Sequence, residues 1–358
     1  MTKNKYIYSV FIILFATLML GCRPCIYNGL VERFRLYIDY HFLGGQQRQE
    51  ALLLQKRNNM LHRYDFPAEN NGWRKVGETP VYGDSITGTI FDPQVILYEG
   101  RFVMTASERK SNSIILLISN DGEHWNHHSM LLFPVKGSWE TVVNRSCLRI
   151  IKGVWHLWYT GQAEGKSVIG HLTSSSLDKF DRPRYNVPVL TPTLEIEGVS
   201  IMNPCVLWDE QNEKFKMWYA AGEQYEPDVI MYAESYDGTS WEKHPNPVLA
   251  KYPKHEWEQE KVGGCDVIQM PNGSFVMYYI GYQNIDVARI CYATSDDGIH
   301  WERPDNNYCL SPSPDAWDAD AVYKPAIVEK DGTQYLWYNG RRGSYEYIGL
   351  AIKEVCPH

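Results

Sequence analysis

Residues 203–222, NPCVLWDEQNEKFKMWYAAG, decide the fold, because versions of this stretch recur along the chain. The stretch begins with an apolar run that ends at Leu207, continues through polar residues 209–214 and closes with the aromatic run 215–220. Two apolar runs around a polar turn predict a hairpin of two β-strands.

Related stretches begin at residues 92, 145, 203, 264 and 324, which are 53, 58, 61 and 60 residues apart. Their second halves end in similar aromatic motifs, among them Trp158-Tyr-Thr-Gly161, Tyr278-Tyr-Ile-Gly281 and Trp337-Tyr-Asn-Gly340. Five similar units at a nearly even period predict a radial or solenoidal β array.

A further strand and an Asp-Gly-x-x-Trp turn follow several of these hairpins. The turns are Asp121-Gly-Glu-His-Trp125, Asp237-Gly-Thr-Ser-Trp241 and Asp297-Gly-Ile-His-Trp301. Asp-Gly tolerates the positive φ of a tight turn, and the Trp side chain can cover the outer edge of a sheet. Each unit is therefore expected to form a blade of four strands.

The last unit ends after three strands, at residues 346–352, and no Asp-Gly-x-x-Trp turn follows. Residues 71–81 match the missing fourth strand, from Trp73 to Pro80-Val81. We therefore predict an all-β fold over residues 71–356. It is a five-bladed β-propeller of four-stranded antiparallel blades, whose ring is closed by the N-terminal strand completing the last blade. A β-sandwich is the alternative architecture.

Residues 1–22 combine Lys3 and Lys5, an apolar run from Tyr6 to Leu20, and Gly21-Cys22. This pattern predicts a lipoprotein-type export signal with lipidation at Cys22, so we expect a lipid anchor in a bacterial membrane, on the periplasmic or cell-surface side. A plain secretory signal or an uncleaved anchor are the alternatives. Residues 23–70 have apolar residues at helical spacing in 30–42 and 46–63, which favours a helical spacer or a partly disordered linker.

The composition narrows the class of partner. The net charge is −8 and no basic run is present, which argues against nucleic acid. The eight Cys show no disulfide framework, and Cys147, Cys205 and Cys265 fall at nearly equivalent points of three units, as expected for small buried strand residues. The Cys spacing gives no zinc site, and we expect no metal or cofactor and a monomer.

The five unit starts are Asp92, Arg145, Asn203, Gly264 and Lys324. In a propeller, these positions face the central channel. A structural repeat requires only a small residue or Pro there, yet the chain places different polar types at equivalent points. The apolar residues around these points recur from unit to unit, whereas the residues at the points themselves differ. This difference predicts a functional site at the channel.

The Phe91-Asp92-Pro93 start, the Trp-Tyr-x-Gly strands, the Asp-Gly-x-x-Trp turns and the five-unit ring resemble the five-bladed glycoside hydrolases and the related mannoside phosphorylases. This resemblance covers about 280 residues. It implies a carboxylate base or nucleophile in the first blade, a second acid in the second blade and a Glu proton donor near the third.

By this resemblance, Asp92 matches the base or nucleophile and Glu197 is the best match to the acid. The second blade departs from the pattern, because Asn144-Arg145-Ser146 stands where fructosidase-like members have Arg-Asp-Pro. The reserve carboxylates near other unit starts are Glu140, Glu260, Asp266 and Asp320.

Glycosidic cleavage requires one protonated and one ionised carboxyl group, which Asp92 and Glu197 could supply. The predicted substrate-binding residues are Arg145, Asn203, Asp266, Asp320, Lys324 and Arg341. The cations among them suit an anionic saccharide or inorganic phosphate, or else they pair with nearby acids. Trp139, Trp257 and Trp317 are either sugar-stacking platforms or core residues.

The sequence therefore supports a glycoside hydrolase acting on an oligo- or polysaccharide. A non-catalytic carbohydrate-binding propeller and a phosphate-dependent glycoside phosphorylase are the alternatives. The missing aspartate of the second blade favours the binding alternative.

Overall fold

The computed structural model describes residues 45–59, 71–222 and 227–355. The predicted export signal, Cys22 and the predicted helix at 30–42 lie outside the described residues. Helix α3, Gly45–Asn59, corresponds to the second predicted helix, whose residues 60–63 lie outside the described ranges. The chain divides into two compact units, Met1–Asn58 and Asn59–His358. No helix within the described ranges is both long and apolar enough to cross a membrane.

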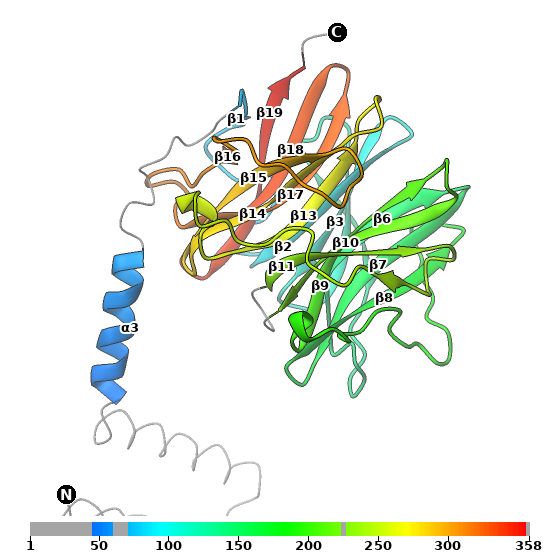
Figure 1. Cartoon of the computed structure of the whole chain (residues 1–358), viewed down its shortest axis with the longest axis horizontal. Helices are drawn as coiled ribbons and strands as arrows, with labels where there is room; N and C mark the ends of the chain where they lie inside the picture. Colours follow the sequence, from blue (N-terminus) through cyan, green and yellow to red (C-terminus); the bar gives the residue numbers. More distant parts are fainter. Residues whose placement is uncertain (1–44, 60–70, 223–226, 356–358) are drawn as a thin grey trace, which may run out of the picture. The chain divides into compact units, whose positions relative to one another are not determined.

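The second unit is built from β-strands, as predicted (Figure 1). The strands are β1 (Arg74–Lys75), β2 (Ile90–Tyr98), β3 (Arg101–Glu108), β4 (Ser113–Ser119), β5 (Asn126–Leu132), β6 (Val142–Ile151), β7 (Val154–Ala163), β8 (Lys166–Ser174), β9 (Ser200–Asp209), β10 (Lys214–Gly222), β11 (Pro227–Ser235), β12 (Glu242–Lys243), β13 (Lys261–Gln269), β14 (Phe275–Asn284), β15 (Val287–Ser295), β16 (Tyr308–Leu310), β17 (Ala321–Lys330), β18 (Thr333–Arg342) and β19 (Tyr345–Glu354). Two short 3₁₀ helices, η1 (Glu195–Glu197) and η2 (Glu256–Glu258), precede β9 and β13.

Within each sheet, strands that are consecutive in sequence pair antiparallel, except β8 and β9. The sheets have the orders β2-β3-β4-β5, β13-β14-β15-β16 and β1-β19-β18-β17, and a larger sheet has the order β12-β11-β10-β9-β8-β7-β6. Within the larger sheet, β8 and β9 meet only through the parallel pair Ser167 and Ser200. In the last sheet, Arg74 and Lys75 of β1 pair with Ile352 and Ala351 of β19, although the two strands lie at opposite ends of the unit's sequence.

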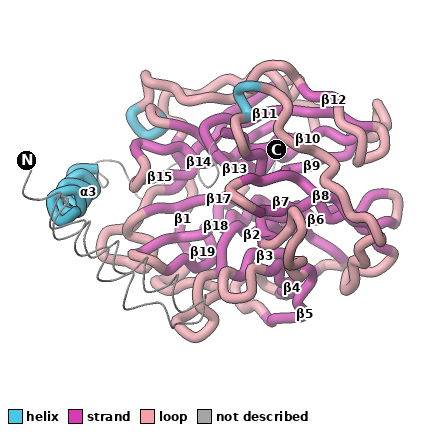
Figure 2. Tube along the Cα trace, turned by 90° about the horizontal axis from the view of Figure 1, so that it is seen from below, coloured by secondary structure: helices cyan, strands magenta, loops and turns pink. Residues whose placement is uncertain are grey.

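The first strand of each hairpin lies at the middle of the unit. β2 contacts β6, β6 contacts β9, β9 contacts β13, β13 contacts β17, and β17 contacts β2 (Figure 2). The buried core consists mainly of aromatic and aliphatic residues between successive sheets. Residues far apart in the sequence therefore meet at the centre.

The Asp-Gly turns link neighbouring sheets. Trp337 of β18 donates a hydrogen bond of 2.9 Å to the carbonyl oxygen of Gly122, and Trp218 of β10 donates one of 2.8 Å to that of Gly298. Gly122 has a φ of 84°, and a Cβ there would lie 2.9 Å from the Trp337 ring. The turn glycine is required by both the backbone conformation and this contact.

The predicted fourth strands are shorter than expected. Residues 187–190 and 246–249 contribute only the isolated bridges of Leu190 to Ile169 and of Leu249 to Ile230. Each segment contains a proline, Pro188 or Pro247, which cannot donate a hydrogen bond to a neighbouring strand. Beyond β11, the outer edge also includes the two residues of β12, whereas beyond β8 the described residues add only the bridge of Leu190.

The cysteines at nearly equivalent points of three units are buried, as predicted. Cys147, Cys205 and Cys265 are free thiols with at most 2% of their surface exposed. The backbone N–H of Val206 donates to the Cys147 sulfur at 3.3 Å, and that of Val267 donates to the Cys205 sulfur at the same distance. The thiols of Cys147 and Cys205 thus connect adjacent inner strands.

Candidate functional site

Four of the five unit starts, Asp92, Arg145, Gly264 and Lys324, lie at β-bulges of the inner strands. The register shifts between Phe91 and Gln94, between Asn144 and Cys147, between Gly263 and Cys265, and between Tyr323 and Ala326. Asp92, Arg145, Asn203 and Lys324 have positive φ angles of 52°, 51°, 54° and 38°. Such angles are costly for residues other than glycine, and a bulge redirects the side chain at that point. The unusual backbone at these positions therefore directs the side chains away from the regular alternation along their strands.

Side chains on the second strand of a neighbouring hairpin hold several of these unit starts. The backbone N–H of Arg145 donates to Ser107 Oγ at 2.9 Å, that of Asn203 to Thr160 Oγ1 at 3.2 Å, and that of Asp92 to Asn339 Oδ1 at 3.4 Å. Ser107, Thr160 and Asn339 occupy β3, β7 and β18. Each of these three positions is thus held by a neighbouring hairpin, which supports a conformation that the isolated strand would not favour.

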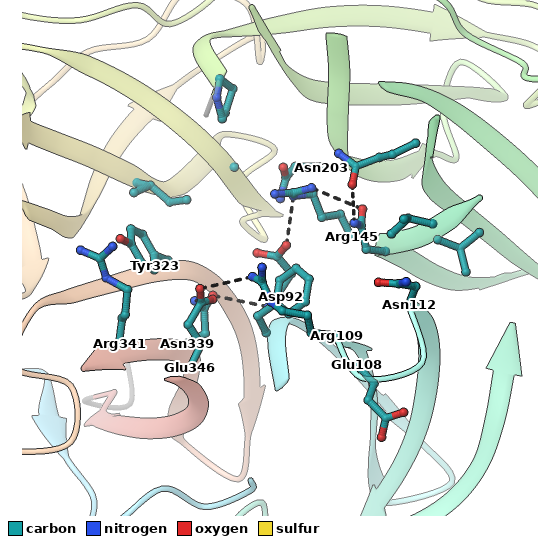
Figure 3. A pocket seen from close by; sticks show the side chains of 18 of the residues that line it. Asp92, Glu108, Arg109, Asn112, Arg145, Asn203, Tyr323, Asn339, Arg341 and Glu346 are labelled. Atoms are coloured by element: carbon teal, nitrogen blue, oxygen red, sulfur yellow. Dashed lines mark hydrogen bonds and ion pairs between the residues drawn. The ribbon is translucent and has the colours of Figure 1, made fainter. Parts of the chain in front are cut away.

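A cavity of about 360 Å³ lies at these bulges (Figure 3). Its lining residues are Phe91, Asp92, Glu108, Arg109, Asn112, Val142, Val143, Asn144, Arg145, Gln162, Asn203, Pro227, Gly264, Ile280, Tyr282, Tyr323, Asn339, Arg341 and Glu346. They come from all the inner strands and from adjacent segments. The cavity therefore combines apolar and aromatic surface with carboxylates, amides and guanidinium groups.

Asp92 is the buried carboxylate of this cavity, with 7% of its surface exposed. Its Oδ2 lies 3.1 Å from Arg145 Nε, and this oxygen has no hydrogen-bond partner among the described residues. Burial raises the pKa of Asp92 above its ordinary value, and the charges of Arg145, Lys324 and Arg109 oppose that rise. Asp92 is thus a buried carboxyl group that faces a cavity and sits next to a fixed cation.

Several predicted site residues meet Asp92 at the cavity. Arg145, Asn203 and Arg341 line it, and so does Gly264. A Cβ on Gly264 would lie 2.9 Å from Asn203 Nδ2 and 3.1 Å from Lys324 Cδ, so the glycine leaves room for both side chains. Lys324 itself is not a lining residue, because its buried ammonium group donates to the Cys265 carbonyl oxygen at 2.9 Å.

Glu197 lies outside the cavity lining, in the 3₁₀ helix η1, and its side chain is fully buried. Lys243 Nζ lies 2.7 Å from each carboxylate oxygen, and Tyr219 donates to Oε1 at 2.7 Å. Burial alone would raise the pKa of Glu197, but hydrogen bonds from the Leu194 and Thr193 backbone, Lys243 and Tyr219 lower it. These contacts favour the ionised form of Glu197, the residue predicted as the general acid.

The same arrangement recurs in other sheets, and we call it the acid–tyrosine–cation group. Its members are Glu140 with Tyr159 and Arg182, Glu197 with Tyr219 and Lys243, Glu258 with Tyr279 and Arg303, and Asp318 with Tyr338 and Lys75. The tyrosine lies on the second strand of the sheet, and the cation comes from the outer edge or the segment next to it. This repetition indicates a structural role for Glu197 and for the reserve residue Glu140.

The remaining predicted carboxylates also lie outside the cavity lining. Asp266 accepts the Ile327 backbone N–H at 2.8 Å and lies 3.7 Å from Arg149, so it joins β13 to β17. Asp320 accepts the Gly343 N–H at 2.8 Å, which fixes the turn between β18 and β19. Glu260 is exposed. The predicted substrate-binding residues Asp266 and Asp320 and the reserve carboxylate Glu260 are thus not among the lining residues.

The tryptophans that precede the inner strands are packing residues. Trp139 stacks on Tyr159 with ring centroids 5.8 Å apart, and Trp317 stacks on Tyr338 at 5.9 Å. Trp257 is buried against Tyr308. None of the three lines the cavity among the described residues, so the core alternative fits these tryptophans.

Arg109, Asn339 and Glu346 are among the cavity residues that were not predicted from the sequence. Asn339 could have been found, because the position it occupies in Trp337-Tyr-Asn-Gly340 is Thr160 in another unit and Ile280 in a third. This is the same divergence within a repeat that identified Asp92. Arg109 follows β3 and Glu346 opens β19, where the repeat gives no comparable pattern.

Comparisons with known proteins agree with this fold. No protein-family profile matches the chain. An uncharacterized protein of Mycobacterium tuberculosis is 26% identical over 210 residues, which cover 55% of this chain and 67% of that protein. A β-1,2-mannobiose phosphorylase of Thermoanaerobacter sp. is 32% identical over 111 residues, but these cover only 27% of this chain and 35% of the phosphorylase.

Solved structures show the fold over most of the chain. A glycoside hydrolase has a TM-score of 0.64 and 16% identity, with 84% of this chain and 96% of that one covered. The complex of a Listeria innocua β-1,2-mannobiose phosphorylase with β-1,2-mannobiose has a TM-score of 0.59 and 13% identity, with 83% and 95% covered. The predicted resemblance to propeller glycoside hydrolases and mannoside phosphorylases is thus confirmed at the level of the fold.

Proposed function

We propose that this protein, which has the fold of the propeller glycoside hydrolases and mannoside phosphorylases, cleaves a glycosidic bond of a saccharide bound in the cavity at Asp92. The observation that carries the proposal is Asp92 itself. It is a buried carboxyl group on a strained bulge, 3.1 Å from Arg145 and exposed to a polar cavity. Strained, partly neutralised groups of this kind concentrate at catalytic sites.

Asp92 acts as the base of the reaction. General-base catalysis is most effective when the pKa of the base lies near the working pH, and burial raises the pKa of Asp92 in that direction. The Arg145 guanidinium group keeps the carboxyl ionised enough to accept a proton. The geometry of Glu197 does not suit the general acid, and that role falls to another cavity residue.

Phosphorolysis is the second candidate, and Arg341 favours it. This residue lines the cavity, and its Nε is buried without a hydrogen-bond partner in the described part of the chain. Guanidinium groups bind phosphate oxygens in a fixed geometry. The partial sequence similarity to a mannobiose phosphorylase supports the same candidate.

A glycan panel tests these proposals. Purified protein is incubated with β-mannosides and other oligosaccharides, with and without inorganic phosphate, and the products are analysed for free sugar and sugar 1-phosphate. Free sugar without phosphate supports hydrolysis, and sugar 1-phosphate formed only with phosphate supports phosphorolysis. Binding without any product would contradict both and favour a carbohydrate-binding protein.

The proposed architecture behind the site is a five-bladed ring closed by β1. The cyclic contacts of the inner strands and the pairing of β1 with β19 support it. Deletion of residues 71–81 is expected to abolish soluble folding. A normally folded deletion variant would contradict this closure.

We also propose that residues 1–22 direct export and that Cys22 carries a lipid anchor, so that the protein acts at a cell surface or in a periplasm. The apolar run followed by Gly21-Cys22 supports this location. Labelling with a fatty-acid analogue, in the wild type and in Cys22→Ser, is the test. Absence of labelling in the wild type would contradict the anchor.

A further inference from the structure

The cavity contains a second acidic residue, Glu346, at the start of β19. Its side chain is 18% exposed, so Glu346 is partly buried, whereas Asp92 is buried. In the sheet, Glu346 pairs directly with Arg341 of β18, another lining residue. The carboxyl group thus enters the cavity from the last sheet, whereas Asp92 enters from β2 of the first.

One amide links the two acids. Asn339 Nδ2 donates a hydrogen bond of 3.1 Å to Glu346 Oε2, and Asn339 Oδ1 accepts the backbone N–H of Asp92 at 3.4 Å (Figure 3). Both ends of the planar Asn339 amide are therefore occupied. The bond from Asp92 fixes the orientation of the amide, and in this orientation its Nδ2 points to Glu346. Asn339 therefore sets the position of Glu346 relative to the bulge that carries Asp92.

The cations around the two acids differ. Arg145 Nε is 3.1 Å from Asp92, and the Arg145 side chain is 15% exposed. Arg109 is 3.6 Å from Glu346, but its side chain is 60% exposed, so that solvent screens its charge. The neighbouring cation therefore stabilises the ionised form more strongly at Asp92 than at Glu346.

Repulsion from the charge of Asp92 also favours the protonated form of Glu346. Burial raises the pKa of Glu346, and the charge of Asp92 raises it further, against the opposing effects of Arg109, Arg341 and Arg145. Two interacting carboxyl groups in one site lose their protons in separate steps. A glycosidase requires this arrangement of one protonated and one ionised group.

We propose that Glu346 is the general acid that works with Asp92, and that Asn339 is its positioning residue; this inference rests on the proposed function. The protonated Glu346 carboxyl gives its proton to the glycosidic oxygen as the bond from that oxygen to the anomeric carbon breaks. In hydrolysis, Asp92 takes a proton from the water that attacks the anomeric carbon. The cycle ends with Glu346 ionised and Asp92 protonated, and proton exchange with solvent restores both.

Kinetics of Glu346→Gln test the acid role, with Glu354→Gln on the same strand as the matched control. We expect kcat to fall by roughly 10²- to 10⁴-fold in Glu346→Gln with KM changed only a few-fold, and the alkaline limb of the pH–rate profile to disappear. The control variant keeps wild-type kinetics. A folded Glu346→Gln protein with wild-type kcat, or with the alkaline limb retained, would overturn the proposal.

A second measurement does not depend on turnover. Carboxyl ¹³C NMR titration follows Glu346 in the wild type and in Asp92→Asn. We expect the pKa of Glu346 to fall in Asp92→Asn, because the charge that raises it is removed. An unchanged Glu346 titration would overturn the pairing. If instead the titration shifts but wild-type protein cleaves no saccharide with or without phosphate, the proposed function fails while the pairing of the two acids stands.

Discussion

Lys243 Nζ lies 2.7 Å from both carboxylate oxygens of Glu197, and the Glu197 side chain is fully buried. This ion pair joins the 3₁₀ helix before β9 to β12 at the outer edge of the sheet. Tyr219 completes the group from β10. An acid that matches a catalytic residue by its sequence position is thus held in an ion pair outside the cavity lining.

Glu197→Gln is therefore expected to destabilise the protein without removing its chemistry. Loss of one partner leaves the Lys243 charge unpaired, and breaking a buried pair costs roughly 3–5 kcal/mol of unfolding free energy. Urea unfolding measures the loss, and kcat is measured below the unfolding transition. Glu195→Gln in the same 3₁₀ helix is exposed and is the control. Wild-type stability combined with a large loss of kcat would support the catalytic role of Glu197 instead.

Lys75 forms the corresponding group in the last sheet. Its ammonium group lies 2.6 Å from Asp318 Oδ2 and donates to the Ser311 carbonyl oxygen at 2.6 Å. Lys75→Met is expected to lower the unfolding free energy by roughly 3–5 kcal/mol, because Asp318 would remain buried and less well paired. Arg74→Met in the same short strand changes an exposed residue and should unfold like the wild type. Equal stability of the two variants would show that Lys75 does not hold β1 in place.

Arg145→Met should change the pH dependence of catalysis. Arg145 stabilises the ionised form of Asp92, so its removal raises the pKa of Asp92 further. Loss of an adjacent cation is expected to move the acidic limb of the kcat/KM profile upward by roughly one to three pH units. The profile is measured from pH 4 to 9, and the Lys152→Met variant of an exposed ion pair is the control. An acidic limb at its wild-type position would contradict the role of Asp92 as the base.

His171 is expected to limit stability in acid. Its ring stacks on Trp158, and its Nε2 lies 3.0 Å from His156 Nδ1. The negative charge of Asp237 acts to raise the pKa of His171. Burial lowers the pKa of His171 to about 3, below the ordinary value of 6.5. The unfolded chain therefore binds more protons between these values, and stability falls as the pH drops from 6.5 towards 3.

Unfolding of the wild type and of His171→Asn at pH 7.5 and pH 4.5 measures this effect. The wild type should lose more unfolding free energy between the two pH values than the variant. An equal loss in both proteins would mean that His171 is not responsible.

The repeat explains how much could be predicted. Equivalent positions of the repeated hairpins lie close together at the centre of the unit. For this reason the sequence alone predicted that Asp92, Arg145 and Asn203 meet at one site. Arg341, predicted from its position after the last aromatic motif, also reaches the cavity. The bulge that redirects these side chains and the neighbouring residues that support it have no sequence pattern of their own.

Pairing between side chains was harder to foresee. Glu197 and Glu140 precede inner strands as a catalytic acid would, yet each faces a tyrosine of its own sheet and a cation from its outer edge or the adjoining segment. Glu346 lies on a third strand, where the repeat comparison identified no site. Its place in the cavity depends on how the last sheet meets the first.

The most direct test of the account is the turnover of a cleaved saccharide by the wild type and by Asp92→Asn. The account predicts a cleaved substrate for the wild type and a kcat lower by roughly 10²- to 10⁴-fold for Asp92→Asn, with an unfolding free energy no lower than that of the wild type. A folded Asp92→Asn protein that cleaves the same saccharide at the wild-type rate would contradict it.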